Sequence, residues 1–161
     1  MNNKNLSVIM SVHNNETSIE KSINSVLDQT YKDFELLVLD DFSTDSTPEI
    51  LNTFKHDSRV KIYSNDKNIG LTKSLNFLIE QSSCKYIFRQ DSDDFSLPTR
   101  FIKQLNILEN TSFRACSTRA INIQTSKKIP GISSWFPKKI TMKYKNPYIH
   151  GTLSIERKLL N

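Results

Sequence analysis

The chain has 161 residues, of which 37% are hydrophobic and 24% are charged, and this composition predicts a single soluble domain with a substantial core. No apolar run is long enough to span a bilayer, and the first residues lack the apolar stretch of a signal peptide, so we expect a cytoplasmic protein. With only three glycines, the chain can form neither a Gly-X-Gly-X-X-Gly dinucleotide turn nor a P-loop, which argues against nicotinamide enzymes and P-loop ATPases.

The net charge of +5 is unevenly distributed along the chain. Residues 127–161 carry eight Lys or Arg and one acid, whereas the preceding residues are slightly acidic. We therefore divide the chain into an α/β core, residues 1–125, and a basic segment of the same domain, residues 126–161. The basic segment is expected to contact the inner face of an anionic membrane, with a solvated surface as the alternative, and no nucleic-acid partner is expected.

The first part of the chain alternates between strand and helix patterns. Residues 6–12 predict a short buried strand, and apolar residues at helical spacing over 19–27 predict the helix that follows it. Residues 34–39 are almost continuously apolar, as expected for a strand that helices cover on both faces. Pro48 suits the first turn of the next helix, and residues 60–63 predict another short strand.

Two further elements complete this repeating pattern before it weakens. A helix from Leu71 precedes a strand that ends near Asp91, and Pro98 opens a fourth helix. Four strand and helix repeats with short loops predict a Rossmann-like α/β fold, a three-layer sandwich with a mostly parallel central sheet. Beyond these repeats, strands are expected at residues 115–123 and 149–155.

Three carboxylates, Asp91, Asp93 and Asp94, directly follow a strand-like run of apolar residues. Strands disfavour Asp, so the chain is expected to leave the sheet here and to carry the acids at its carboxyl edge, where open α/β sheets bind ligands. Carboxylates this close repel one another unless a cation offsets their charge, and Mg²⁺ or Mn²⁺ bound together with a substrate phosphate would do so. A solvated acidic turn is the alternative.

Acids also follow the second predicted strand, at Asp40 and Asp41. Parallel strands present their carboxyl ends together, so the loops after the first, second and fourth strands are expected to form one nucleotide and metal site. In that site Asp40 or Asp41 can accept a hydrogen bond from a nucleobase N–H or a ribose hydroxyl. For these two residues a solvated turn is the alternative.

Several blocks of the chain resemble, in order, the motifs of family-2 inverting glycosyltransferases of the GT-A fold. The blocks are Ser7 to Asn14, Ser25 to Tyr31, Phe34 to Asp45, Asn68 to Gly70, and Asp91 to Asp94 with Pro98 and Arg100. The resemblance is continuous over residues 6–110, and residues 146–152 resemble a further motif. It implies the nucleotide-binding core of a metal-dependent inverting enzyme. Such an enzyme moves a sugar from a nucleoside-diphosphate sugar to an acceptor hydroxyl in cell-surface polysaccharide or glycolipid synthesis.

The resemblance also implies which residues contact the nucleotide base. Ser11 and His13 match the first loop, which contacts the base, and Asp41 matches the acid that reads the base edge. The family often has Pro and Tyr where this chain has Ser11 and His13, so an ordinary polar loop residue is the alternative for His13. A UDP-sugar is the first expectation for the donor and a saccharide or lipid-linked molecule for the acceptor, while the residues leave the base, the sugar and the acceptor open.

The acidic triplet matches the family's Asp-X-Asp motif for metal and nucleotide. Asp91 is expected to contact the nucleotide, and Asp93 with the neighbouring Asp94 is expected to ligate the metal. Carboxylate oxygens suit hard divalent ions. The resemblance therefore makes Mn²⁺ or Mg²⁺ the expected cofactor.

The catalytic base is not identified by the sequence. Inversion requires a base that takes the proton of the acceptor hydroxyl, and in the family an acid beyond the late motif serves. After Glu109 the chain has one acid, Glu156, and one histidine, His150. Either of these is the base, or the chain is truncated before it, and a structural role is the alternative for His150. Without an efficient base the chain would act as a nucleotide-binding module. A receiver-type signalling domain is disfavoured, because its acid pair should follow the first strand.

Overall fold

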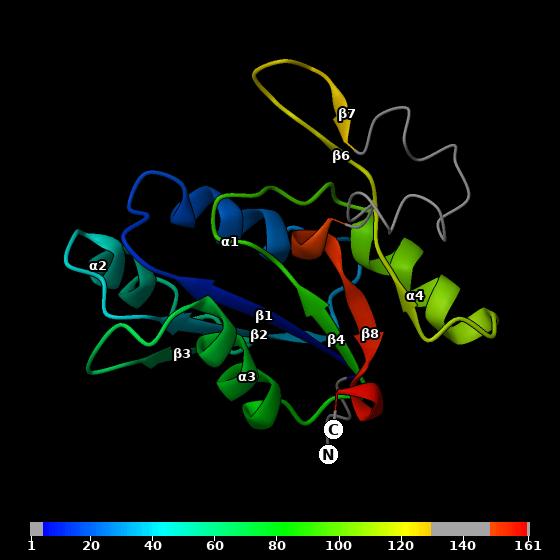
Figure 1. Cartoon of the computed structure of the whole chain (residues 1–161), viewed down its shortest axis with the longest axis horizontal. Coiled ribbons are helices and arrows are strands. Elements are labelled where there is room, and N and C mark those ends of the chain that lie inside the picture. The colour runs from blue at the N-terminus through cyan, green and yellow to red at the C-terminus, as the bar shows by residue number, and fades with distance from the viewer. Residues whose placement is uncertain (1–4, 130–148, 161) are drawn as a thin grey trace.

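A computed structural model describes residues 5–129 and 149–160 of the chain. Four strands and four helices alternate up to Asn110, as the sequence pattern predicts (Figure 1). They are β1 (Leu6–Val12), α1 (Ile19–Leu27), β2 (Phe34–Asp40), α2 (Thr47–Asn52), β3 (Val60–Ser64), α3 (Leu71–Gln81), β4 (Tyr86–Arg89) and α4 (Arg100–Asn110). The later elements are β5 (Ala115–Cys116), β6 (Ala120–Ile121), β7 (Lys128–Ile129), the 3₁₀ turn η2 (His150–Thr152), β8 (Ser154–Glu156) and the 3₁₀ turn η3 (Arg157–Leu159). None of the described helices is both long and apolar enough to cross a membrane.

The main sheet has six strands in the order β3-β2-β1-β4-β8-β5, and the first four run parallel. Strand β8 runs antiparallel to both of its neighbours. The chain moves outward from β1 to β3 and then returns to the other side of β1 with β4, so the strand order reverses between β1 and β4 (Figure 1). The predicted mostly parallel α/β fold is confirmed. Sheets of this kind bind ligands outside the carboxyl ends of the strands, at the point of reversal.

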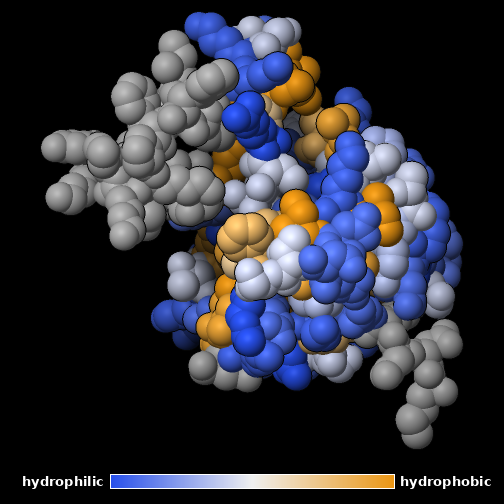
Figure 2. All heavy atoms as spheres, turned by 90° about the vertical axis from the view of Figure 1, so that its right-hand side faces the viewer, coloured by the Kyte–Doolittle hydropathy of each residue, from blue (hydrophilic) through white to orange (hydrophobic). Residues whose placement is uncertain are grey.

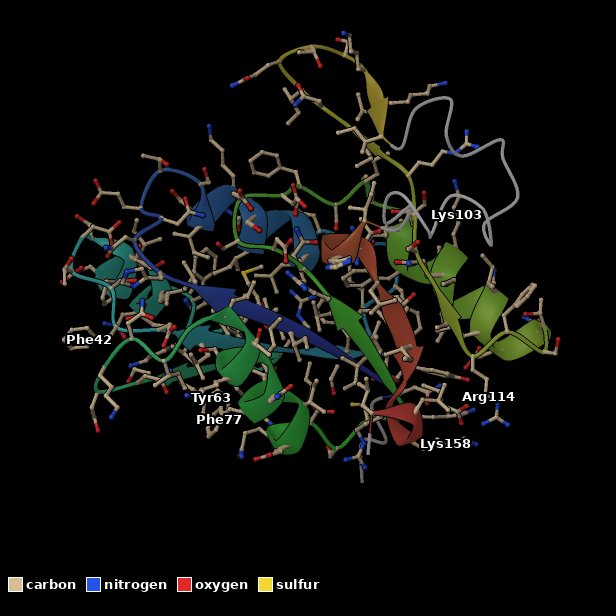
Figure 3. All side chains as sticks on the ribbon, viewed as in Figure 1. Phe42, Tyr63, Phe77, Lys103, Arg114 and Lys158 are labelled. Atoms are coloured by element: carbon tan, nitrogen blue, oxygen red, sulfur yellow. The ribbon has the colours of Figure 1, made fainter. Side chains whose placement is uncertain are left out.

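Helices cover both faces of the sheet and make three layers. Helices α1, α2 and α4 pack on the even-numbered residues of β1 and β2. In this core Phe101 meets the rings of Phe34 and Phe88 edge-on, at 5.5 Å between centroids. Helix α3 covers the opposite face, where Phe77 meets Tyr63 of β3 edge-on at 5.4 Å (Figure 3). Apolar side chains at helical spacing form one stripe on each helix, which is why each helix buries one face. Seen from the α4 side, the described surface is mostly hydrophilic, with apolar side chains in small groups (Figure 2).

The end of the described chain is less regular than its sequence pattern predicts. The strand expected over 149–155 is wrong in its first half, because η2 occupies residues 150–152 and β8 begins at Ser154. Thr152 donates its backbone N–H and its hydroxyl to the carbonyl of Ile149, at 3.2 and 3.1 Å, and such local bonds compete with strand pairing. The strand expected over 115–123 divides into β5 at the edge of the main sheet and β6 in a separate hairpin with β7.

Candidate functional site

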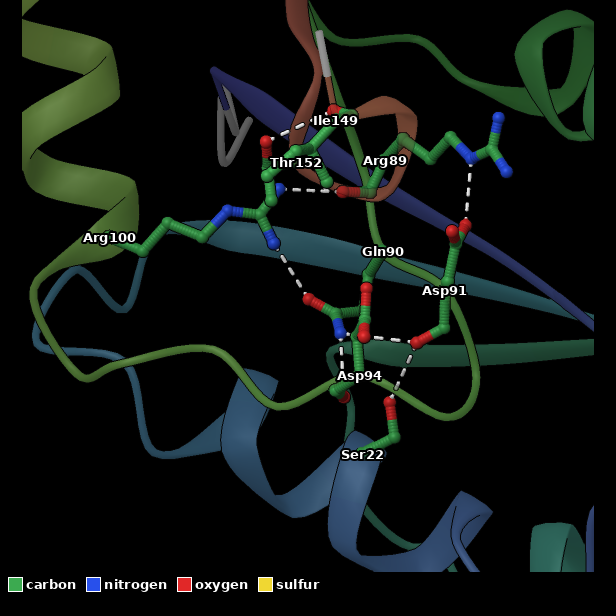
Figure 4. Close-up of polar contacts among 8 residues, drawn as sticks. All are labelled: Ser22, Arg89, Gln90, Asp91, Asp94, Arg100, Ile149 and Thr152. Carbon is green, nitrogen blue, oxygen red and sulfur yellow. Dashed lines mark hydrogen bonds and ion pairs between the residues drawn. The ribbon is translucent and has the colours of Figure 1, made fainter. Parts of the chain in front are cut away.

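The acidic loop, residues 90–99, begins where the chain leaves β4 and is built around the buried side chain of Gln90. The amide nitrogen of Gln90 donates to the carbonyls of Asp91 and Asp94, at 3.1 and 2.8 Å (Figure 4). Its amide oxygen accepts from the Ser96 hydroxyl at 2.6 Å and from Nη1 of Arg100 at 2.7 Å. Because one side chain satisfies both ends of the turn, Gln90 sets the shape in which the acids are presented.

Arg100, the first residue of α4, has a buried guanidinium that hydrogen-bonds to Gln90 on the inner side of this turn. Its Nη2 donates to the carbonyl of Arg89 at 2.6 Å, and its Nε donates to Oε1 of Gln104 at 2.9 Å. Gln104 in turn donates to the carbonyl of Thr152 at 2.8 Å, which ties η2 to the same network. Burial lowers the pKa of Arg100 to about 10, against the opposing charges of Asp94 and Asp91. At neutral pH Arg100 therefore remains a cation behind the acidic loop.

Asp91 is held from two sides. Its Oδ1 accepts from Nε of Arg89 at 2.8 Å (Figure 4). Its Oδ2 lies close to Gly151 in η2. A Cβ on residue 151 would lie 2.6 Å from Oδ2 of Asp91 and 2.9 Å from Oδ2 of Asp94. A larger residue at position 151 would therefore require these carboxylates or the turn to move. Ser22 of α1 also donates to the backbone carbonyl of Asp91 at 3.1 Å, which joins the first helix to the acidic loop.

Asp93 and Asp94 are the exposed members of the acidic triplet. Partial removal from water and the negative charges of Asp91 and Asp93 raise the pKa of the Asp94 carboxyl. Neighbouring acids therefore contribute to the shift, and a cation beside them would favour the ionised form of Asp94. Within the described residues no three His, Cys, Asp or Glu side chains form a complete metal site. Asp93 and Asp94 fit a hard divalent ion that takes its remaining ligands from phosphate and water.

Asp41, at the end of β2, is buried and already has protein partners. Its Oδ1 accepts from Nδ2 of Asn65 at 2.8 Å and from the backbone of Ile69 at 2.9 Å, and its Oδ2 accepts from the backbone of Gly70 at 2.8 Å. Burial raises the pKa of Asp41, but the hydrogen bonds from Ile69, Asn65 and Gly70 outweigh it and leave the pKa below its usual value. Asp41 thus fixes the start of α3, and base reading by Asp41 stays a prediction. Neighbouring Asp40 accepts from the backbone and hydroxyl of Ser43.

Ser11, expected in the first loop, lies in β1 and is half-buried, whereas His13 lies in the loop after β1 and is exposed. Backbone and side-chain hydrogen bonds join this loop to the loop after β2. They run from Asn14 N to Ser43 Oγ at 2.9 Å, from Thr44 N to Asn14 Oδ1 at 2.7 Å, from Glu16 N to Asp45 Oδ2 at 3.0 Å, and from Ser46 N to Glu16 Oε2 at 2.8 Å. Asn15 then donates to the Ser92 hydroxyl at 3.1 Å. The structure therefore gathers all three predicted loops at one edge of the sheet.

The two candidates for the catalytic base lie in different places. His150 opens η2 next to Gly151 and so lies near the acidic loop. Glu156 pairs with Tyr86 at the start of β4, on the opposite edge of the sheet from Asp91. A hydrogen bond from Lys158 at 2.8 Å lowers its pKa, and Arg114 lies 3.3 Å away; Figure 3 places both basic residues far from Phe42, which marks the carboxyl edge. Glu156 therefore lies at the amino edge of the sheet, away from the acidic loop, and its role as the base stays a prediction.

Several site residues were not singled out by the sequence. Gln90 and Gln104 carry a signal only in hindsight, as polar residues in positions where the periodicity requires buried ones. Arg89 gave no pattern of its own, and Gly151 lay in the motif over residues 146–152 without an assigned role, because the roles of both depend on contacts with Asp91 across the fold.

Comparison with known proteins agrees with this geometry. The sequence model described as Glycosyl transferase family 2 matches residues 7–159. A putative glycosyltransferase, EpsE of Bacillus subtilis, is 33% identical over 156 residues, which cover 92% of this chain and 55% of EpsE. The O-antigen biosynthesis glycosyltransferase WbnJ of Escherichia coli is 36% identical over 166 residues, which cover 96% of this chain and 63% of WbnJ. The chain thus spans about half the length of several curated relatives.

Solved structures share the fold. The mannosyltransferase PcManGT of Pyrobaculum calidifontis, in complex with GDP-Man and Mn²⁺, aligns with a TM-score of 0.77 at 19% identity over 96% of this chain and 45% of its own. Residues 1–349 of TarS from S. aureus, in complex with UDP-GlcNAc, align with a TM-score of 0.72 at 20% identity over 97% of this chain and 46% of that chain. The described fold is therefore of the GT-A type.

Proposed function

Because the chain belongs to glycosyl transferase family 2, we propose that it binds a nucleoside-diphosphate sugar at the carboxyl edge of β1, β2 and β4 and transfers the sugar to an acceptor hydroxyl with inversion. The observation that carries the proposal is the acidic loop at the strand reversal. There Asp91 and Asp94 both turn an oxygen toward Gly151, beside the joined loops of β1 and β2. In this proposal the acidic loop would hold the cation and the diphosphate, and the loops after β1 and β2 would hold the nucleoside.

Each residue has a proposed task in this site. Asp93 and Asp94 would hold Mn²⁺ or Mg²⁺, and the bound ion would supply Lewis-acid stabilisation of the diphosphate leaving group. Asp91, which Arg89 orients, would contact the nucleotide. Asp41 would accept from the base edge with its remaining lone pairs, and Ser11 of β1 and His13 of the loop after it would contact the base.

The relatives support the choice of substrates. PcManGT binds GDP-Man with Mn²⁺, TarS binds UDP-GlcNAc, and WbnJ is named for O-antigen biosynthesis. We propose that this chain uses a UDP- or GDP-sugar and contributes to a cell-surface polysaccharide or glycolipid. Residues 1–125 would bind the donor. The basic residues 126–161 would form the acceptor side and contact anionic membrane, consistent with the position of η2 on the acidic loop.

His150 is the favoured base candidate, because its turn lies beside Gly151 and the acids. A nucleotide-binding module with slow transfer is the second candidate function. It is favoured by the position of Glu156 on the opposite edge of the sheet. Turnover of the donor with a saccharide acceptor distinguishes the two, since His150→Ala should lower turnover about 10² to 10⁴-fold if His150 is the base.

Isothermal titration of UDP, GDP and TDP, each with and without Mn²⁺, tests the donor site. A nucleoside diphosphate should bind in Mn²⁺ and bind weakly without it, because the uncompensated acids repel its phosphates. Asp33→Asn is the matched control, since Asp33 is exposed just before β2, at the amino edge. Absence of binding for all three nucleotides in Mn²⁺ would contradict the proposal.

A further inference from the structure

Arg89, the last residue of β4, is an arginine at the end of a strand with its side chain only 19% exposed. Its backbone is fixed on both sides, because it pairs with Ile9 of β1 and donates its N–H to the carbonyl of Leu153 at 2.8 Å. Its Nε then donates to Oδ1 of Asp91 at 2.8 Å (Figure 4). A short charge-assisted bond from a rigid strand gives the carboxylate one preferred orientation.

Arg89 is also the charge partner of the acidic loop. Of the residues that the structure describes, it alone provides a cation within ion-pair distance of the acidic triplet. Arg100 lies deeper and gives its hydrogen bonds to neutral oxygens of Gln90, Ser96, Arg89 and Gln104. The charge on Arg89 therefore acts directly on Asp91, whereas that on Arg100 acts from a distance.

The contacts of Asp91 set it apart from the other two acids. Arg89 occupies its Oδ1, and this ion pair is particular to Asp91, whereas Gly151 lies close to the Oδ2 atoms of both Asp91 and Asp94. Asp93 and Asp94 have exposed side chains, so a cation can approach them from solvent. The three acids thus differ in how readily they can ligate a metal ion, although they are neighbours in the sequence.

We propose that Arg89 is a positioning residue that holds Asp91 away from the metal and offsets one negative charge, so that the loop binds a nucleoside diphosphate together with one divalent ion. The inference rests on the proposed function. It predicts opposite effects when Arg89 is removed. A released Asp91 makes the loop a stronger ligand for a bare cation and a poorer site for an anionic diphosphate.

Two variants and a matched control test this role. Arg89→Gln removes the charge, Arg89→Lys keeps it without the guanidinium geometry, and Arg59→Gln breaks a similar pair, since Arg59 Nη2 lies 2.7 Å from Asp57 in the turn before β3. Circular dichroism and thermal melts establish that each variant folds. Mn²⁺ binding is measured alone by electron paramagnetic resonance, and UDP and GDP binding is measured by calorimetry in saturating Mn²⁺.

Arg89→Gln should bind Mn²⁺ alone roughly 3- to 10-fold more tightly and bind the preferred nucleotide roughly tenfold more weakly, by the size of a charge-assisted bond. Arg89→Lys should restore the Mn²⁺ affinity to about that of the wild type, and Arg59→Gln should change neither affinity. If Arg89→Gln bound both Mn²⁺ and the nucleotide more weakly, or if neither affinity changed, the proposal would be overturned. A wild-type chain that binds no nucleotide in Mn²⁺ would overturn the proposed function and this inference with it, whereas nucleotide binding that Arg89→Gln leaves unchanged would overturn only the role of Arg89.

Discussion

Oδ2 of Asp91 lies so close to the backbone of Gly151 that a Cβ at residue 151 would be only 2.6 Å from it. The two residues come from the acidic loop after β4 and from the turn before β8, sixty residues apart in the sequence. Their contact closes one side of the acidic loop. It makes residue 151 as important for the shape of the site as the acids themselves.

Gly151→Ala should therefore distort the acidic loop. The added methyl group meets two carboxylates, so either the turn or Asp91 must move, at a cost of roughly 1–3 kcal/mol in the free energy of unfolding. Nucleotide binding in Mn²⁺ should weaken more than this stability loss explains. Chemical denaturation and calorimetry on the same variant measure the two effects, and unchanged values in both would show that the contact is not made in solution.

Asp93→Asn should remove most of the Mn²⁺-dependent nucleotide binding and leave the fold intact, because Asp93 is exposed on the acidic loop. Calorimetry of the preferred nucleotide in Mn²⁺ measures the loss. The exposed Asp33→Asn serves as the control for a change of one charge. Equal affinities for wild type and Asp93→Asn would refute the metal assignment.

Asp41→Ala should destabilise the protein by roughly 1–3 kcal/mol, because the donors of Asn65, Ile69 and Gly70 lose their acceptor. If Asp41 also reads the base, the variant should lose more affinity for the preferred nucleotide than for the other two. A thermal melt measures the first effect and a comparison of UDP, GDP and TDP the second. Equal losses for all three nucleotides would leave Asp41 with a structural role only.

The ion pair of Arg59 with Asp57 should make stability depend on acid pH. The hydrogen bond from Arg59 is the main reason that the pKa of Asp57 falls from 3.8 to about 2. A lowered pKa in the folded state adds stability above pH 3.8, and this stability is lost as the pH falls toward 2. Asp57→Asn should lose roughly 1–2 kcal/mol at neutral pH and almost nothing near the lower pKa. Denaturation across this range tests the prediction, and a loss that does not vary with pH would contradict it.

Gln90→Leu should show that the acidic loop needs its buried amide. The carbonyls of Asp91 and Asp94 and the guanidinium of Arg100 would lose a partner inside the turn, which should cost roughly 2–4 kcal/mol. Gln29→Leu offers a comparison, since Gln29 is equally buried and serves the far end of the same loop through the carbonyl of Leu97. Retained nucleotide binding in Gln90→Leu would mean that the loop is shaped by other contacts.

The sequence by itself determined the α/β class, the four strand and helix repeats and the acids at the strand ends. Those features are local, since apolar periodicity and turn residues act within one element. It also predicted that the loops of β1, β2 and β4 would meet, because parallel strands share a carboxyl edge. Only the tertiary structure decided which acids already have protein partners and which are open to a ligand. Arg89, Gly151 and Asn65 reach Asp91 and Asp41 from other elements. The antiparallel pairing of β8 with β4 likewise placed Glu156 at the amino edge, away from the acidic loop, because strand direction is set by long-range pairing that no local pattern records.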